Sequence, residues 1–84
     1  MEIAWTNHAR RRLIEWSKTR GVTQEKVEAV ARQPEQIVTG HADLYVAQAR
    51  IDNGLLRVPF FEVEGVRTIV TVYWTSRIHR YWET

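Results

Sequence analysis

The chain has 84 residues, a formal net charge of +2 and no cysteine. A chain this short predicts one domain, residues 1–84, and the absence of cysteine excludes disulfides and thiolate metal sites. No apolar run approaches the ~18 residues of a membrane span, and the start of the chain lacks a signal-peptide core, so we expect a soluble cytoplasmic protein without a membrane partner. Ten of the twelve basic residues are arginine, which suits bidentate phosphate recognition.

The first half of the chain predicts two short helices. Residues 1–5 are mostly apolar, which is typical of an edge strand. Thr6 or the asparagine after it offers an N-cap for a helix through about Thr19, and Gly21 offers a left-handed residue that ends it. Thr23 caps a second helix, which Pro34 stops at about position 32 or 33. The residues at helical spacing that would face the sheet are Ala9, Leu13, Trp16, Val27, Val30 and Ala31.

The second half of the chain predicts an antiparallel sheet. Residues 35–39 form an extended connector, and three strand-like runs follow it. These runs are Leu44–Ile51, Leu55–Val63 and a third that continues from Val66 toward Trp82. Asn53-Gly54 is a strong hairpin signal between the first two runs, and Gly65 marks a second tight turn. We therefore expect an α+β fold with two N-terminal helices packed on one face of a three- to four-stranded antiparallel sheet.

The first turn sets the register of the first two strands. If Asn53-Gly54 is a two-residue loop, positions 47, 49 and 51 face the core, and Arg50 lies opposite Arg57 on the outer face. Like charges placed directly opposite each other cost a few tenths to ~1 kcal/mol. This pair predicts either a nearby carboxylate or a site for an anion. The alternative is a solvated face on which arginine stems cover apolar carbon.

The second turn allows two registers. A two-residue loop at Glu64-Gly65 would turn positions 69, 71 and 73 toward the core. A three-residue loop that starts one residue earlier turns positions 66, 70, 72 and 74 inward and buries more carbon, so we favour it. With continued alternation, the open face then carries Thr71, Tyr73, Arg77, His79 and Tyr81.

These side chains make metal-free RNA cleavage chemically feasible. The reaction needs a base for the 2′-OH proton, an acid for the 5′-oxygen and cations for the scissile phosphate, which His, Tyr and Arg can supply. The histidines lack metal-ligand spacing and the glycines form no nucleotide-binding loop, so we expect no metal and no cofactor. The candidate catalytic residues are Arg57, Tyr73, Arg77, His8 and His79. The candidates for RNA binding are Arg12, Arg50, Tyr81 and Trp82, the last two by stacking on bases.

Each candidate also has a purely structural interpretation. His8 lies in the first turn of a helix, where a histidine is often a surface residue or a backbone cap. Tyr73 could be a half-buried sheet aromatic with its hydroxyl in water. His79 and Tyr81 lie near a chain end that frays, and Trp82 could be an apolar tail tucked against the sheet.

Three motifs occur in order along the chain. They are His8-Ala9-x-x-Arg12-Leu13, Arg20-Gly21-Val22-Thr23-x-Glu25-x-Val27 and Gln33-Pro34-Glu35. Three predicted strands follow, the last containing Val70-Thr71-Val72-Tyr73. In this layout the chain resembles, over nearly its whole length, a small uncharacterised family that is grouped with the RelE/ParE-like toxins. The tail from Arg77 to Trp82 matches only loosely.

The resemblance implies a RelE-like fold and a toxin of a toxin–antitoxin type system. In such proteins, basic residues on the open sheet face and a Tyr or His near the last strand carry RNA cleavage. Carried over by position, Arg57, Tyr73 and Arg77 are the best matches, and His8 and Arg12 are the signature of this subgroup. The implied partners are RNA, including ribosome-bound mRNA, and a small antitoxin protein. A gyrase-directed toxin and a non-catalytic protein-binding module that uses the same face remain alternatives.

Overall fold

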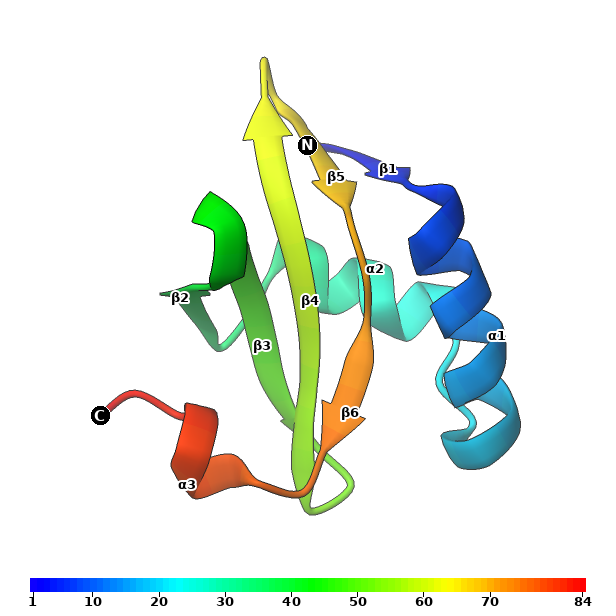
Figure 1. Ribbon diagram of the computed structural model, residues 1–84, viewed down its shortest axis with the longest axis vertical. Coiled ribbons are helices and arrows are strands. Elements are labelled where there is room, and N and C mark those ends of the chain that lie inside the picture. The colour runs from blue at the N-terminus through cyan, green and yellow to red at the C-terminus, as the bar shows by residue number, and fades with distance from the viewer.

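Two helices lie against a six-stranded sheet, and a third, short helix follows the last strand (Figure 1). The computed structural model describes all 84 residues. In chain order the elements are β1 (Glu2–Trp5), α1 (Asn7–Arg20), α2 (Gln24–Arg32), β2 (Gln36–Thr39), the 3-10 turn η1 (His41–Asp43), β3 (Tyr45–Ile51), β4 (Gly54–Val63), β5 (Val66–Ile69), β6 (Tyr73–Thr75) and α3 (Ile78–Tyr81).

The strands are ordered β1-β5-β4-β3-β2, and β6 pairs with β4 beyond the end of β5. Helix α2 crosses behind the sheet and α1 runs along its β1–β5 side (Figure 1). This confirms the predicted α+β arrangement of helices on a sheet. The predicted edge strand at the start of the chain is present as β1. The sheet is larger than predicted, because the expected connector at residues 36–39 forms β2 and the third predicted strand is divided into β5 and β6. It is mixed rather than antiparallel, because β1 runs parallel to β5.

Side-chain caps set the helix boundaries that the sequence predicts. The Thr6 hydroxyl accepts a hydrogen bond from the N–H of Ala9 at 3.0 Å, and the Thr23 hydroxyl accepts one from the N–H of Lys26 at 3.1 Å. Gly21 ends α1 with φ of 66°, in the left-handed region that glycine adopts without strain. None of the helices is long and apolar enough to cross a membrane.

The hydrophobic core lies between the helices and the rear face of the sheet. The helices contribute the predicted residues Ala9, Val27, Val30 and Ala31, with Leu13 and Trp16 packed against them. The sheet contributes Ala47, Leu56, Val58, Phe60, Ile69 and Val72. Full burial of a Val, Leu, Ile or Phe side chain stabilises by ~1.5–3 kcal/mol relative to exposure, so this cluster supplies most of the driving force for folding.

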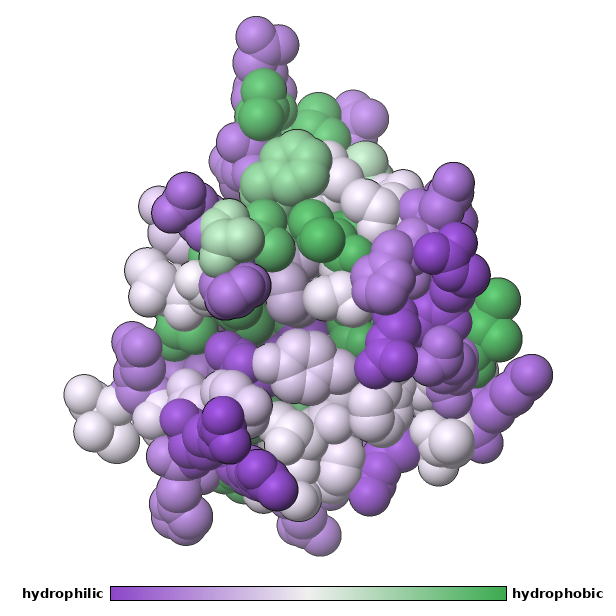
Figure 2. Space-filling model, in the orientation of Figure 1, coloured by the Kyte–Doolittle hydropathy of each residue, from purple (hydrophilic) through white to green (hydrophobic).

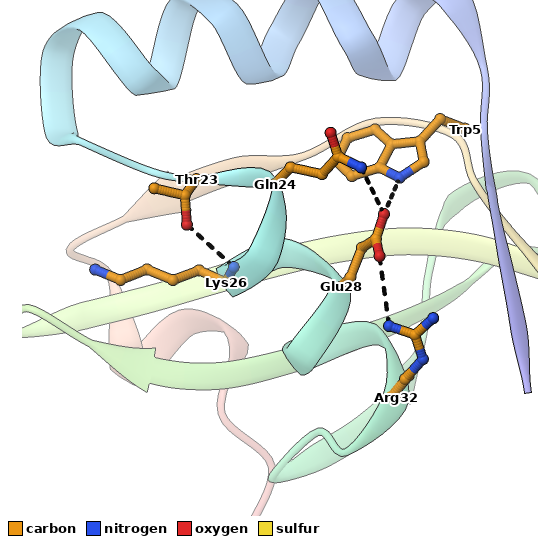
Figure 3. Close-up of polar contacts among 6 residues, drawn as sticks. All are labelled: Trp5, Thr23, Gln24, Lys26, Glu28 and Arg32. Atoms are coloured by element: carbon orange, nitrogen blue, oxygen red, sulfur yellow. Dashed lines mark hydrogen bonds and ion pairs between the residues drawn. The ribbon is translucent and has the colours of Figure 1, made fainter.

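Glu28 connects α2 to the first strand (Figure 3). Its carboxylate accepts hydrogen bonds from the indole N–H of Trp5 at 2.8 Å and from the amide of Gln24 at 3.0 Å, and it pairs with Arg32 at 3.4 Å. The hydrogen bond from Trp5 is the largest cause that lowers the pKa of Glu28, with smaller contributions from Gln24 and Arg32, while burial opposes the shift. The folded state therefore favours the ionised carboxylate.

Glu28→Gln is expected to lower the free energy of unfolding by ~1 kcal/mol near neutral pH, because a charge-assisted acceptor becomes a neutral one. A lowered pKa stabilises the fold above the ordinary pKa of glutamate, and this contribution is lost as the pH falls through the folded-state pKa. The difference between wild type and variant should therefore shrink in acid. Urea unfolding at neutral and acidic pH measures both effects. Glu25→Gln, on the exposed first turn of α2, is the control; a pH-independent difference for Glu28→Gln would contradict this role.

The first hairpin turns one residue earlier than predicted. Ile51 pairs with Gly54, so the loop is Asp52-Asn53, and both loop residues have positive φ, of 53° and 64°. This is the pattern of a type I′ turn, which Asp and Asn tolerate. The pairing of β3 with β4 is therefore shifted by two residues from the predicted one. Each side chain still lies on the predicted face of the sheet, but the predicted cross-strand partners are wrong. Arg50 lies opposite Leu55, and the residue opposite Arg57 is Gln48.

Gly54 is required by close packing and not by its φ angle. A Cβ at this position would overlap the carbonyl oxygen of Thr75 and the indole ring of Trp74. Gly54→Ala is therefore expected to lower the free energy of unfolding by ~2 kcal/mol, because overpacking forces backbone and ring to move. Gly65→Ala is the control: it meets no neighbour within 4 Å but has φ of 79°, so it should cost only ~1 kcal/mol. Urea unfolding should give the larger loss for Gly54→Ala, and equal losses would contradict the packing explanation.

The second turn is the two-residue loop, so the favoured three-residue loop is wrong. Val63 pairs with Val66, and Glu64 and Gly65 have φ of 50° and 79°. Ile69 is accordingly buried opposite Phe60. The predicted inward positions of Val66 and Val70 are not found, because both side chains stay partly exposed outside the core cluster.

A bulge then restores the predicted faces of the last strand. Ile69 pairs with Phe60, and Tyr73 pairs with Arg57. Between these two pairs the last strand has three residues, 70–72, whereas β4 has only two, 58 and 59. The extra residue reverses the alternation, so Val72 is buried in the core and Tyr73 lies beside Arg57. Pro59 explains the position of the bulge. Its carbonyl accepts from Val70 on the β5–β6 side, where a proline has no N–H to continue the ladder.

Candidate anion site on the open face

The face of β3 and β4 opposite α2 is here called the open face. The 3-10 turn η1 and helix α3 lie on this side of the sheet, with the middle of β3 and β4 between them (Figure 1). Figure 2 shows this side in the same orientation. Apolar residues gather over the upper part of β4 and β5, while paler and hydrophilic residues occupy the middle of the face. The open face is therefore divided into an apolar end and a polar centre.

Arg57 lies at this polar centre. The residue is only 6% exposed, although its side chain carries a permanent charge. The Nε–H donates to the side-chain oxygen of Gln48 at 2.9 Å, and Nη1 donates to the hydroxyl of Tyr73. The guanidinium also lies over the ring of Tyr81, 4.0 Å from its centroid, which is within cation–π range. Arg57 is therefore held in one orientation by three different side chains.

No carboxylate neutralises this buried charge. The ion pairs of the chain are Arg12–Glu15, Arg32–Glu28 and Arg67–Glu62. Moving an ion out of water costs several kcal/mol when no partner compensates for it, and an amide, a phenol and an aromatic ring compensate only partly. This arrangement leaves the electrostatic potential at Arg57 positive and favours an anion beside it.

The second terminal nitrogen of Arg57, Nη2, makes no hydrogen bond within the chain. The only side-chain polar atom that is both fully buried and unpartnered is Nε1 of Trp16, so Nη2 keeps access to solvent. It thus remains available for a ligand, in the planar geometry that matches phosphate or carboxylate oxygens.

A pocket of about 580 Å³ opens beside Arg57. Its polar or aromatic lining groups include Arg57, Tyr73, Tyr81, Thr71 and His41, and no Asp or Glu lines it. Elsewhere too, the chain gathers no group of three or more His, Cys, Asp or Glu side chains that could hold a metal ion. The lining therefore suits an anionic ligand better than a cation.

Tyr73 is the second reactive group of the pocket. Burial raises the pKa of Tyr73 above its usual range, and the charge and hydrogen bond of Arg57 oppose this rise. The phenol is therefore protonated at neutral pH. Its oxygen accepts from Arg57, and the neighbouring Tyr81 adds to the rise in the pKa of Tyr73. In this environment Tyr73 can act as a proton donor but is poorly suited to act as a base.

Helix α3 completes the pocket, and two glutamines fix its position. The Gln48 amide donates to the carbonyl of Tyr81 at 3.1 Å and to Gln36 at 2.8 Å. The Gln36 side chain in turn accepts from the N–H of Glu83 at 3.1 Å. Gln48 is completely buried, so these bonds are shielded from water. The same amide side chain thus orients both Arg57 and the helix that carries Tyr81.

The structure brings together three of the predicted site residues, Arg57, Tyr73 and Tyr81. Arg50 and Trp82 form a separate stacked pair, with the guanidinium 4.3 Å from the ring centroid. The predicted strand ends at Thr75, so Arg77, His79 and Tyr81 do not continue its alternation, and the prediction that they do is wrong. Tyr81 reaches Arg57 from α3, whereas Arg77 and His79 are exposed there and do not line the pocket.

The predicted residues His8 and Arg12 lie apart from this site. His8 is an exposed residue of α1, and Arg12 pairs with Glu15 on the same helix at 2.8 Å. No hydrogen bond, ion pair or ring contact connects either residue to Arg57 or Tyr73. Their helix lies along the β1–β5 side of the sheet, away from η1 and α3 (Figure 1).

Sequence reasoning missed two residues of the site. Gln48 was placed on the open face, but its role as the partner of Arg57 depends on the actual turn. Gln48 stands between Ala47 and Ala49 in a mostly apolar strand, and this is the signal that a glutamine there is buried and hydrogen-bonded. His41 lies in a loop without periodicity, and only the fold brings it to the pocket.

Comparison with known proteins identifies a family but no characterised relative. The model of the family described as Domain of unknown function (DUF4258) matches residues 5–74. No curated protein and no solved structure matches the chain. The matched region contains Gln48, Arg57 and Tyr73 and stops before α3.

Proposed function

The chain belongs to the family described as Domain of unknown function (DUF4258), and within that family we propose that it acts as a toxin-like, metal-independent RNA endonuclease. The observation that carries this proposal is Arg57. A buried guanidinium without a carboxylate, with a free nitrogen at an open pocket, is a site for an anion. Among common cellular anions, a phosphodiester also makes use of the neighbouring phenol.

The proposed roles follow from the geometry. Arg57 binds the non-bridging oxygens of the scissile phosphate and stabilises the charge that grows on them in the transition state. Tyr73 donates its proton to the 5′-oxygen as the P–O bond breaks. The 2′-hydroxyl of the RNA is the nucleophile, so the products carry a 2′,3′-cyclic phosphate and a 5′-hydroxyl. Arg50 and Trp82 form their own stacked pair, and Trp82 directly follows Tyr81 in the chain, so this pair is proposed to contact the neighbouring nucleotides.

We further propose that the chain is related to the RelE/ParE-like toxins and works in the cytoplasm. Two features support the relation: helices pack on one face of the sheet, and the basic site lies on the other. The proposed partners are mRNA, free or ribosome-bound, and a small antitoxin that neutralises the protein. An antitoxin must cover the Arg57 pocket or displace α3 to do so.

One observation favours a second function, a non-catalytic protein-binding module. Phe61 and Val63 on β4 are 42% and 59% exposed, next to the polar centre of the open face. Exposed apolar groups of this kind mark protein contacts. A gyrase-directed toxin would be one form of such a binder. In this case Arg57 and Tyr73 would have structural roles only. Neither the wild type nor variants at these two positions would cleave RNA in any assay.

Expression in bacteria tests the proposal. Induction of the wild-type chain should slow growth and shorten cellular mRNA, and Arg57→Lys should abolish both effects at equal protein levels. Arg77→Lys, an exposed arginine outside the pocket, is the matched control and should remain toxic. Growth arrest with intact mRNA would instead favour the binding module, and a supercoiling assay on the same extracts would identify gyrase as the target.

A further inference from the structure

His41 is the only imidazole at the pocket. It lines the same cavity as Arg57 and Tyr73, whereas the other two histidines, His8 on α1 and His79 on α3, do not. The proposed cleavage requires a group that removes the 2′-hydroxyl proton. Tyr73 is protonated and Arg57 is permanently charged, so neither can do this at neutral pH.

The loop that carries His41 has an unusual backbone. Ala42 and Asp43 follow it with φ of 56° and 62°, in the left-handed region that residues with a Cβ adopt only at a cost. Two consecutive residues of this kind persist only where the surrounding structure holds them, and such strain is concentrated at functional sites. Here the strained backbone fixes the direction in which the loop leaves β2.

Two hydrogen bonds within the loop and one close contact with the sheet hold the loop in place. The N–H of Gly40 donates to the carbonyl of Leu44 at 2.7 Å, and the N–H of Leu44 donates to the carbonyl of His41 at 3.1 Å. Gly40 also lies so close to the sheet that a Cβ there would be 2.8 Å from a methyl group of Val46. The loop is therefore docked on β3, beside the pocket, rather than free in solvent.

We propose that His41 is the general base of the cleavage reaction, an assignment that rests on the function proposed above. An imidazole nitrogen of His41 takes the proton from the 2′-hydroxyl as the 2′-oxygen forms its bond to phosphorus. The bond from phosphorus to the 5′-oxygen breaks, and that oxygen receives the proton of Tyr73. One proton is taken and one is given, so the step needs no other reactant. The groups around His41 that carry charge or titrate are Arg57, Tyr73 and Tyr81 in the pocket and Asp43 in the loop.

His41→Ala tests this role in purified protein with a labelled RNA oligonucleotide. The cleavage rate should fall by 10²–10⁴-fold, the range for loss of a general base, while binding of a 2′-O-methyl RNA that cannot be cleaved stays unchanged. The wild-type pH–rate profile should have a rising limb on its acidic side, as general-base catalysis requires, and this limb should vanish in the variant. Added imidazole should restore part of the rate. His8→Ala and His79→Ala, at exposed positions outside the pocket, should retain the wild-type profile.

The possible failures are distinguishable. If wild-type protein cleaves RNA and His41→Ala cleaves it at a similar rate, the assignment of His41 is overturned while the proposed function stands. A variant that loses RNA binding together with cleavage would make His41 a ligand of the RNA, which also overturns its role as base. If wild-type protein leaves RNA intact with and without ribosomes, both proposals are overturned.

Discussion

Arg57→Lys is expected to reduce RNA cleavage by ~10³-fold, although the positive charge is retained. The planar guanidinium of Arg57 bonds to Gln48 and Tyr73 and still presents a third nitrogen to the pocket. The single ammonium group of lysine cannot do all three. The phosphate would lose a transition-state contact, and Tyr73 would lose the bond that orients its hydroxyl. The loss should appear in the rate of a single turnover at saturating enzyme, because the chemical step is affected more than binding.

A stability measurement keeps this result interpretable. Arg57 is buried, so its replacement also lowers the free energy of unfolding, and rates must be compared at a temperature at which both proteins are folded. Arg77→Lys provides the control, because Arg77 is exposed at the start of α3. We expect this control to cleave RNA at the wild-type rate. Comparable activity of Arg57→Lys and wild type would show that the buried guanidinium has only a structural role.

Tyr73→Phe is expected to slow cleavage by 10²–10⁴-fold, the usual contribution of a general acid. The substitution removes one hydroxyl and keeps the ring, so the pocket keeps its shape. Burial raises the pKa of Tyr73, so the wild-type phenol keeps its proton beyond the usual pH range of tyrosine. The wild-type rate should therefore not fall between neutral pH and about pH 9, whereas an unperturbed phenol would begin to lose its proton near the upper end.

A substrate with a better leaving group separates the acid role from a structural one. If the 5′-oxygen is replaced by sulfur, the leaving group needs no proton, and Tyr73→Phe should cleave this RNA almost as fast as wild type does. Tyr45→Phe is the control, because Tyr45 is half-exposed on the other side of β3, near Phe60. An equal defect of Tyr73→Phe on both substrates would contradict proton donation.

Local signals in the sequence predicted the helices well. The helix caps are the ones expected from the sequence: the side chains of Thr6 and Thr23 cap the N-termini, and Gly21 ends α1 in a left-handed conformation. Each cap depends only on residues within one turn of the helix. The buried stripe of α2 followed from spacing alone. Such elements are predictable because the interactions that define them are close in the sequence.

The turns were less predictable, because several residues tolerate positive φ. Asp52-Asn53 and Asn53-Gly54 are both acceptable type I′ loops, and the choice between them depends on Gly54, which must stay without a side chain beneath Trp74. This contact joins residues 20 positions apart and is invisible to a local pattern. The predicted pair of facing arginines failed for that reason.

The position of Tyr73 was predicted correctly on incorrect grounds. The three-residue loop and the bulge at 70–72 each shift the alternation by one residue, so an error in the first was offset by the second. Pro59 in the middle of a strand was the available signal for the bulge. Helix α3 had no such signal, because it is four residues long, has no side-chain cap and is held by the distant Gln36 and Gln48.

The most direct test of the central claim, that Arg57 and Tyr73 hold a phosphodiester for metal-free cleavage, is the chemistry of the RNA ends. Purified protein should be incubated with labelled RNA, both in EDTA and on ribosomes in magnesium, and the new termini identified by mass spectrometry. We expect 2′,3′-cyclic phosphate and 5′-hydroxyl ends from the wild type and no new ends from Arg57→Lys. Intact RNA in both settings, or 5′-phosphate ends that form only with magnesium, would contradict the claim.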